Sequence, residues 1–161
     1  MQSKDIINLT QTLGDKFLIQ KIILTTVESC TGGLLSAQLT NTPGSSTWFD
    51  RGFITYSNQS KIDCVKVKKD TIDKYGSVSQ QTANEMALGA VNNSQANLGL
   101  SITGIAGPGG ASKNKPVGLV YIGIKKGNKI IIKENIFKNK NRISIQKATV
   151  NISLKMINKI I

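Results

Sequence analysis

Hydrophobic and polar positions recur along this chain with two different periods, and these periods predict alternating helices and strands. Residues 3–19 carry apolar side chains at the spacing of a helix, at Ile6, Leu9, Leu13 and Phe17. Residues 21–28, KIILTTVE, form a short apolar run that predicts a buried strand ending near Glu28. The chain is therefore expected to begin with one helix and one buried strand.

The same two patterns predict the remaining elements. Gly32 and Gly33 open a second helix, which ends at NTPGSS, residues 41–46. Further helices are predicted at 59–65, at 70–75, after a capping Ser79 and at about 142–161. Strands are predicted at 51–58 and 97–104, followed by a hairpin of 116–127 with 128–137 that turns at Gly127 and Asn128.

This order of elements predicts an α/β fold. Residues 1–161 contain neither a repeat nor a low-complexity linker, so a single domain is expected. Its mixed β-sheet would be covered by helices on both faces, as a three-layer α/β/α sandwich. Ligands of such sheets bind beyond the carboxyl ends of the strands. Three polar clusters follow predicted strands, and they therefore predict one shared site: ESCTGG, YSNQSK and SITGIAGPGG.

The absence of histidine restricts the chemistry of this site. With no imidazole, a Ser-His-Asp or Cys-His triad is excluded, and so is a zinc site of the usual histidine-bearing kinds. The two cysteines, Cys30 and Cys64, lack CxxC spacing and predict neither a disulfide framework nor a metal site. Lysine, carboxylates, tyrosine or water remain as bases, and serine with lysine is the natural pair.

Charge and hydropathy add little to this picture. The net charge is +12, but only two of the 21 basic residues are arginines and aromatic residues are few. A solvated basic surface is therefore favoured over a nucleic-acid site. No apolar run approaches the roughly 20 residues that span a bilayer, and the N-terminus lacks an apolar signal core. A soluble, cytoplasmic protein without a membrane partner is expected.

The stretch ESCTGG provides a candidate nucleophile. Ser29 lies at a strand-to-helix turn, where free N–H groups bind anions, so an attacking hydroxyl would have oxyanion donors nearby. The plainer alternative is that Ser29 or Thr31 caps the helix and that the glycines relieve backbone crowding. Cys30 is the rival nucleophile, but it lacks a histidine partner and is interpreted as a small buried side chain.

The other two clusters provide a candidate base and a candidate binding loop. Lys61 could accept the serine proton if burial lowers its pKa, with Tyr56 relaying or holding that proton. The alternative is that Lys61 is solvated, as most lysines are. The loop GIAGPGG is neither a P-loop nor a dinucleotide fingerprint, but its amides could hold a phosphate. Lys115 could meet that phosphate or merely precede the next strand.

Several motifs in the same order resemble one known family. ESCTGG, GSSxWFxRGFxTYSNxxK, YGxVS, ANEMALGA, SITGIAGPGG and KPVG resemble the CinA C-terminal-domain family of bacterial nicotinamide-nucleotide amidases over nearly the whole chain. The resemblance implies a stand-alone α/β domain that hydrolyses nicotinamide mononucleotide to nicotinate mononucleotide and ammonia. Attack by Ser29 with Lys61 as its base would demand no metal or organic cofactor.

The family pattern, carried over by position, implies specific roles. Catalysis falls to Ser29, Tyr56 and Lys61. Substrate binding falls to Thr31, Gly32, Gly33, Ser45, Ser46, Asn58, Thr103, Gly104, Gly107, Gly109, Lys115 and Arg142. Glu28 is a candidate neighbour for the positively charged pyridinium, with a capping or salt-bridge role as its alternative. Ala111, Lys113 and Asn114 depart from the family pattern.

Three functions follow as hypotheses. The first is the amidase, which takes a small nucleotide and needs no nucleic acid. The second is a non-catalytic nucleotide-binding module that would tolerate the loss of Lys61. The third is a basic interaction protein of DNA uptake or repair, which predicts steeply salt-dependent DNA binding. Because the site lies at an exposed sheet end, a second subunit could complete it, and a homo-oligomer is expected.

Overall fold

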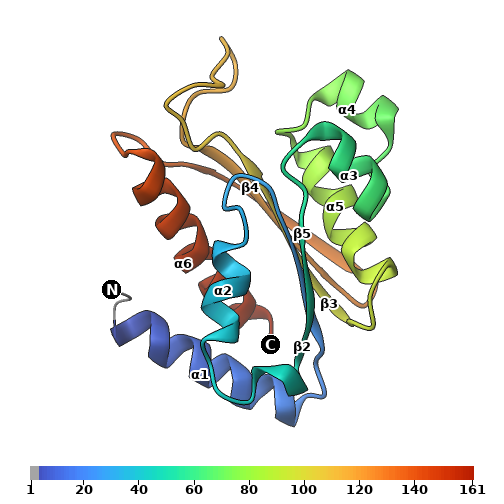
Figure 1. Ribbon diagram of the computed structural model, residues 1–161, viewed down its shortest axis with the longest axis vertical. Coiled ribbons are helices and arrows are strands. Elements are labelled where there is room, and N and C mark those ends of the chain that lie inside the picture. Colours follow the sequence, from blue (N-terminus) through green and yellow to red (C-terminus); the bar gives the residue numbers. More distant parts are fainter. Residues whose placement is uncertain (1–3) are drawn as a thin grey trace.

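The computed structural model describes residues 4–161 and contains one five-stranded mixed sheet (Figure 1). The strands are β1 (Leu24–Glu28), β2 (Phe49–Ile54), β3 (Leu98–Gly104), β4 (Leu119–Lys126) and β5 (Lys129–Ile136). They lie in the order β2-β1-β3-β4-β5. β1 pairs in parallel with both β2 and β3, whereas β4 pairs antiparallel with β3 and with β5. The carboxyl ends of β1, β2, β3 and β5 therefore point to the same edge of the sheet.

Helices cover both faces of this sheet (Figure 1). One face carries α1 (Lys4–Ile19), α2 (Leu34–Thr40) and α6 (Arg142–Ile160). The other face carries α3 (Asn58–Val65), α4 (Lys69–Tyr75) and α5 (Gln80–Asn92). A short 3-10 helix, η1 (Ser45–Thr47), precedes β2. The predicted three-layer α/β/α architecture is confirmed.

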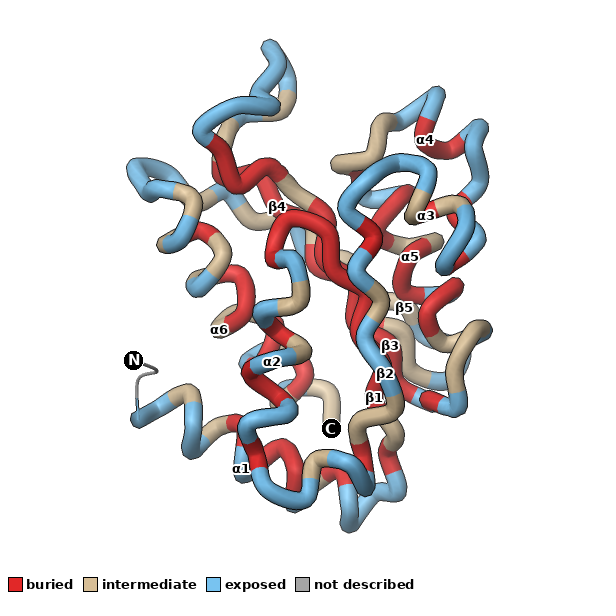
Figure 2. Tube along the Cα trace, in the orientation of Figure 1, coloured by how far each residue is buried: buried red, intermediate tan, exposed pale blue. Residues whose placement is uncertain are grey.

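Each interface between helices and sheet has its own hydrophobic core, and the central strands β1, β3 and β4 are mostly buried between them (Figure 2). On the side of α1, α2 and α6, the rings of Phe17 and Trp48 pack with centroids 5.2 Å apart, against buried residues of β1, β3 and β4. On the side of α5, Val27 and Met86 pack with residues of α3 and α4. Helices on both faces explain why the residues of β1 and β3 are buried almost without interruption rather than alternately.

Several predicted boundaries are confirmed and two are corrected. Ser79 Oγ accepts from the N–H of Thr82 at 3.1 Å and so caps α5 as predicted, and the final hairpin turns at Gly127 and Asn128. The first strand begins at Leu24 rather than at residue 21, because Lys21 adopts a left-handed φ of 54° in the turn after α1. The second strand is β2, which ends at Ile54 and leaves Tyr56 in a loop. Residue 3, the predicted start of the first helix, lies outside the described residues.

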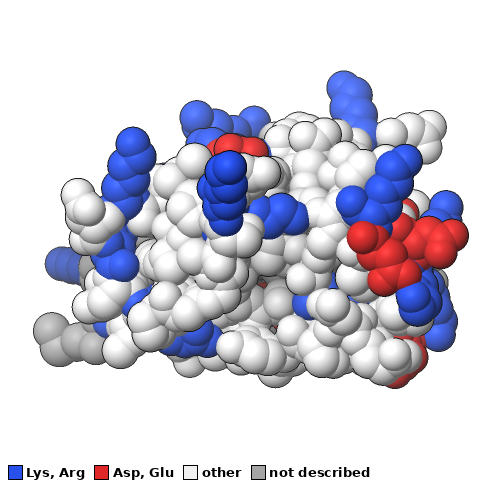
Figure 3. Space-filling model, turned by 90° about the horizontal axis from the view of Figure 1, so that it is seen from above, with Lys and Arg blue, Asp and Glu red and all other residues white. Residues whose placement is uncertain are grey.

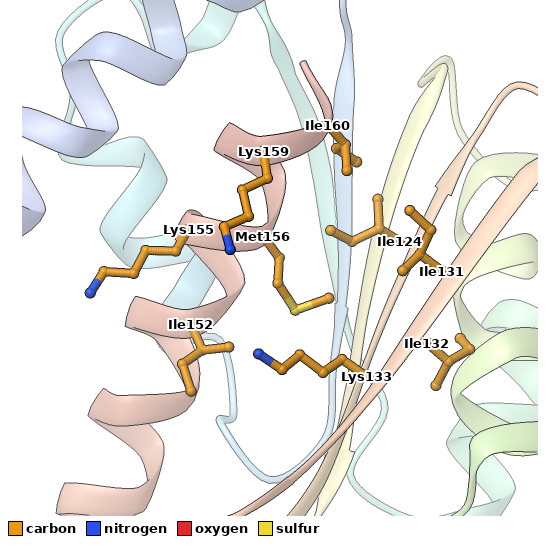
Figure 4. Close-up of a pocket in the computed structure, with 9 residues that line it drawn as sticks. All are labelled: Ile124, Ile131, Ile132, Lys133, Ile152, Lys155, Met156, Lys159 and Ile160. Carbon is orange, nitrogen blue, oxygen red and sulfur yellow. The ribbon is translucent and has the colours of Figure 1, made fainter.

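The edge strand β5 borders a shallow groove of about 450 Å³ between the sheet and α6 (Figure 4). Its apolar floor includes Ile124, Ile131 and Met156, and α6 leaves Ile131 44% exposed. Lys133 reaches from β5 toward α6 across this groove (Figure 4). The side chains that line the groove include three lysines and no carboxylate, so its rim is uniformly basic.

Among the helices of residues 4–161, none is both long enough and apolar enough to cross a membrane.

Candidate active site

A pocket of about 260 Å³ lies at the edge of the sheet where β1, β2 and β3 end. Residues from all three strand ends line it, and α6 closes it with its first residue. The lining consists of Ser29, Cys30, Tyr56, Lys61, Ser77, Val78, Thr103, Gly104, Ile105, Ala106, Gly107, Gly109, Gly110 and Arg142. Figure 3 looks down on this end of the molecule, where basic side chains outnumber acidic ones. The three polar clusters therefore meet, as the sequence predicted.

Ser29 and Lys61 are in direct contact in this pocket. The Nζ of Lys61 lies 3.1 Å from Ser29 Oγ and 2.7 Å from the carbonyl oxygen of Thr55. Ser57 caps α3 through the N–H of Ser60, and this cap starts the helix one turn before Lys61. The helix then directs the lysine back under the end of β1, where only 1% of its surface is exposed. The alternative that Lys61 is solvated is therefore excluded, because the side chain is buried.

Burial lowers the pKa of Lys61 from 10.5 to about 8. About a tenth of the amine is therefore uncharged at pH 7, and about half at pH 8. A neutral amine keeps two N–H donors, which the carbonyl of Thr55 and the more distant carbonyl of Tyr56 or Ser57 can accept. Its lone pair is then available to the hydroxyl proton of Ser29. The pair has the contact and the protonation state that a general base and a nucleophile require.

Acyl transfer by Ser29 is expected to accelerate with pH and to level off above about pH 8, because only neutral Lys61 can accept the proton. Well below that pKa, each pH unit should lower the rate about tenfold. The measurement is kcat/KM for amide hydrolysis between about pH 6 and about pH 9.5. A profile that stays flat from about pH 6 to about pH 8 would show that Lys61 is not the base.

Cys30 borders the pocket but is unsuited to attack. Burial raises the pKa of its thiol to about 12, and the neighbouring Glu28 adds to this effect. The thiol therefore stays protonated at neutral pH, and a thiol is a far weaker nucleophile than a thiolate. This supports the interpretation of Cys30 as a small buried side chain and leaves Ser29 as the candidate nucleophile.

Glu28 stabilises the start of α2 rather than facing the pocket. Its carboxylate is fully buried and accepts from the N–H groups of Gly33, Leu35 and Ser36, at 2.8 to 3.1 Å, and from the Ser36 hydroxyl at 2.7 Å. Every oxygen lone pair directed at the helix start is thus used, and the negative charge offsets the positive end of the helix dipole. The expectation that Glu28 contacts a pyridinium is corrected, and its alternative role as a cap is the one observed.

Tyr56 and Arg142 form the outer wall of the pocket. The guanidinium of Arg142 donates through Nη2 to the Tyr56 hydroxyl at 2.9 Å and through Nη1 to the carbonyl of Gly107 at 2.8 Å. Arg142 thereby ties α6 to the glycine-rich loop. The Tyr56 hydroxyl is engaged with Arg142 and, among residues 4–161, has no hydrogen bond to Ser29 or Lys61. The expected proton relay through Tyr56 is therefore not needed, since Ser29 and Lys61 touch directly.

The structure places several predicted binding residues away from the pocket. Ser45 and Ser46 lie in η1, which precedes β2 and so occupies the opposite edge of the sheet. Asn58 opens α3 on the exposed surface, and Lys115 donates to the carbonyl of Tyr75 at 2.6 Å. In a single chain, these four residues do not contribute to the pocket.

The turn residues Thr31, Gly32 and Gly33 are held behind the pocket rather than in its lining. Gly32 and Gly33 adopt φ values of 60° and 97°, which favour glycine, and Gly33 is the N-cap residue of α2. Thr103, Gly104, Gly107 and Gly109 do line the pocket. Within the described chain, the buried hydroxyl of Thr31 has no hydrogen-bond partner.

Sequence reasoning missed other residues of the site. Ser77 and Val78 line the pocket, and the carbonyl of Ser77 accepts from the hydroxyl of Thr103 at 2.7 Å. Gln146, on α6, donates through Nε2 to the carbonyl of Cys30 at 2.8 Å. The motif YGxVS was a signal for the segment that contains Ser77, whereas no local signal marked Gln146.

A serine and a buried lysine thus lie in contact at the carboxyl edge of a mixed α/β sheet, beside a glycine-rich loop, which is where ligands of such sheets bind. Residues 6–161 match the CinA C-terminal domain, and the chain belongs to this family. Relatives include a "Putative competence-damage inducible protein" of Clostridium novyi, 53% identical over 73% of this chain and 28% of its own length. Another of the same name, from Clostridium tetani, is 48% identical over 89% of this chain and 35% of its own length.

The chain spans about a third of the length of the curated relatives it matches. Solved structures match it over nearly the full length of both chains. The competence/damage inducible protein CihA from Agrobacterium tumefaciens is 41% identical, with a TM-score of 0.95 over 99% of this chain and 97% of that one. A CinA superfamily protein from Escherichia coli is 27% identical, with a TM-score of 0.94 over 100% of this chain and 94% of that one.

Proposed function

We propose that this domain hydrolyses the carboxamide of nicotinamide mononucleotide, giving nicotinate mononucleotide and ammonia. The observation that carries the proposal is the 3.1 Å contact between Ser29 Oγ and the buried Nζ of Lys61. A hydroxyl beside an amine whose pKa is lowered to about 8 is an activated nucleophile without histidine. Membership of the CinA C-terminal-domain family is consistent with this proposal.

In the proposed reaction, neutral Lys61 accepts the proton of Ser29 while the serine oxygen attacks the carboxamide carbon. The tetrahedral intermediate then collapses. Lys61 returns the proton to the departing nitrogen, so that ammonia leaves and an ester to Ser29 remains. Water attacks this ester, Lys61 accepts the water's proton and passes it to Ser29, and the acid is released.

The remainder of the pocket suits the nucleotide part of the substrate. Arg142 has guanidinium donors beyond the two it uses on Tyr56 and Gly107, and an arginine fork matches a phosphate. The glycine-rich loop offers backbone amides at Gly109 and Gly110. The exposed ring of Tyr56 can lie against the cationic pyridinium, a favourable cation–π contact. The proposed orientation therefore places the amide near Ser29 and the phosphate near Arg142.

The test is ammonia release from nicotinamide mononucleotide, with free nicotinamide as the control substrate and Ser29→Ala as the control protein. We expect release from the nucleotide only, and none with the serine variant, provided that circular dichroism shows it folded. If the folded wild type binds the nucleotide but releases no ammonia, the domain is a binding module. Steeply salt-dependent binding to DNA without ammonia release would instead favour the DNA-associated function.

A further inference from the structure

The turn that carries Ser29 leaves two backbone amides without backbone acceptors. The N–H of Ser29 donates to the carbonyl of Ile102 at 2.9 Å, that of Gly32 to the carbonyl of Ser29 at 3.0 Å, and that of Gly33 to Glu28. Within residues 4–161, the N–H groups of Cys30 and Thr31 have no backbone acceptor, and the Cys30 N–H meets only the weakly accepting thiol of its own side chain. Buried amides are almost always paired, so an unpaired one beside a nucleophile points to a ligand atom.

We propose that the backbone N–H of Cys30 donates to the oxyanion of the tetrahedral intermediate, and that Gln146 is the residue that positions it. This inference rests on the proposed acyl transfer at Ser29. Cys30 lines the same pocket as Ser29, whereas Thr31 does not. The N–H of the residue after the nucleophile is the common oxyanion donor when the nucleophile sits on a strand-to-helix turn.

Two hydrogen bonds fix the orientation of this amide. The carbonyl of Ser29 accepts from Gly32, and C=O and N–H point in opposite directions across a trans peptide, so the N–H of Cys30 points out of the turn. On the other side of the residue, Gln146 Nε2 holds the carbonyl of Cys30 at 2.8 Å. Both peptide planes that flank Cys30 are therefore fixed before charge develops, which is the condition for effective oxyanion stabilisation.

Gln146 is well placed for this role because α6 is already anchored to the pocket. Arg142 lies one turn earlier on the same helix and bonds to Gly107 and to Tyr56. The contact between Gln146 and Cys30 thus connects the nucleophile turn to a helix that also holds the glycine-rich loop. Removing it would free the peptide between Cys30 and Thr31, and so one of the two constraints on the Cα of Cys30, without removing the contact between Ser29 and Lys61.

The first experiment compares Gln146→Met, which keeps side-chain bulk but loses the donor, with Lys147→Met at an exposed position of the same helix. We expect Gln146→Met to lower kcat about tenfold to a hundredfold, with KM and the pH profile unchanged. We expect Lys147→Met to leave both kcat and KM unchanged. The rate at which a fluorophosphonate labels Ser29 should fall in parallel with kcat, because that reaction also develops an oxyanion.

The second experiment removes the N–H itself. Lactic acid incorporated at position 30 lacks the amide hydrogen, and Cys30→Ala retains it with the same small side chain. We expect labelling by the fluorophosphonate to be about 10²- to 10³-fold slower with lactic acid than with alanine. Equal labelling rates, or a Gln146→Met variant that changes only KM, would overturn the inference.

The labelling rates also separate this inference from the proposed substrate. If Ser29 is labelled but nicotinamide mononucleotide is not hydrolysed, the substrate is wrong and the oxyanion donor is still tested by the two pairs of variants. If the folded wild type neither hydrolyses the nucleotide nor is labelled, both proposals fall.

Discussion

Replacing Lys61 with methionine is expected to lower kcat/KM for amide hydrolysis by about three orders of magnitude, within the range known for general bases. Methionine fills a similar volume but cannot accept the proton of Ser29, and among residues 4–161 no other base contacts that hydroxyl. Steady-state ammonia release at about pH 8.5, where wild-type Lys61 is mostly neutral, gives the measurement. Lys147→Met serves as the matched control, and a loss below about tenfold would contradict the role of Lys61.

The same variant should change how stability depends on pH. The folded pKa of Lys61 is about 8 and the unfolded value is 10.5, so between these values the unfolded chain holds more protons and wild-type stability rises with pH. Below about pH 8 both states are protonated, and the folded state carries the whole cost of the buried charge, about 3 kcal/mol. Urea unfolding gives the free energy of unfolding of Lys61→Met minus that of the wild type at about pH 7 and at about pH 10.5. This difference should be smaller at the higher pH by about that amount. Parallel pH dependences would contradict the lowered pKa.

Replacing Glu28 with glutamine is expected to destabilise the fold by about 1 to 3 kcal/mol, the cost of leaving buried hydrogen-bond donors without an acceptor. The carboxylate accepts from three backbone amides and one hydroxyl. The NH2 group of a glutamine cannot accept a hydrogen bond, so some of these donors would lose their acceptor. Urea unfolding of Glu28→Gln measures the loss, with Glu134→Gln on the exposed face of β5 as the matched control. A difference of less than about 1 kcal/mol between the two variants would show that the buried charge does not support α2.

Periodicity and glycine positions predicted most of the fold because each element has a local signal. The helix after Ser79, the final hairpin and the buried strands β1 and β3 all follow from spacing within short windows. The convergence of Ser29 and Lys61 also followed, since parallel strands deliver their carboxyl ends to one edge. Local patterns were weaker at the start of β1 and at the end of β2. Lys21 adopts a left-handed backbone conformation before β1, and Tyr56 lies in a loop after β2.

The contacts and placements that the sequence did not predict depend on packing between distant segments. Gln146 reaches Cys30 across 116 positions and Arg142 reaches Tyr56 across 86, and only the placement of α6 over the sheet brings these pairs together. Ser45 and Ser46 precede β2, so strand direction carries them to the amino edge, away from Ser29. Glu28 was ambiguous because a carboxylate at a strand end can face either a ligand or the helix that follows, and burial decides for the helix.

The lysine rim of the groove beside β5 also bears on how this molecule meets its own copies. An edge strand with three successive isoleucines, Ile130 to Ile132, is a template for pairing with the same strand of another molecule. Two such edges would bring Lys133 of each copy together, along with the lysines of α6, on a protein of net charge +12. This repulsion acts over about 10 Å at 0.1 M salt but only about 3 Å at 1 M. We therefore expect the charge repulsion of these lysines to oppose pairing of two β5 strands, and we expect concentrated salt to weaken that repulsion.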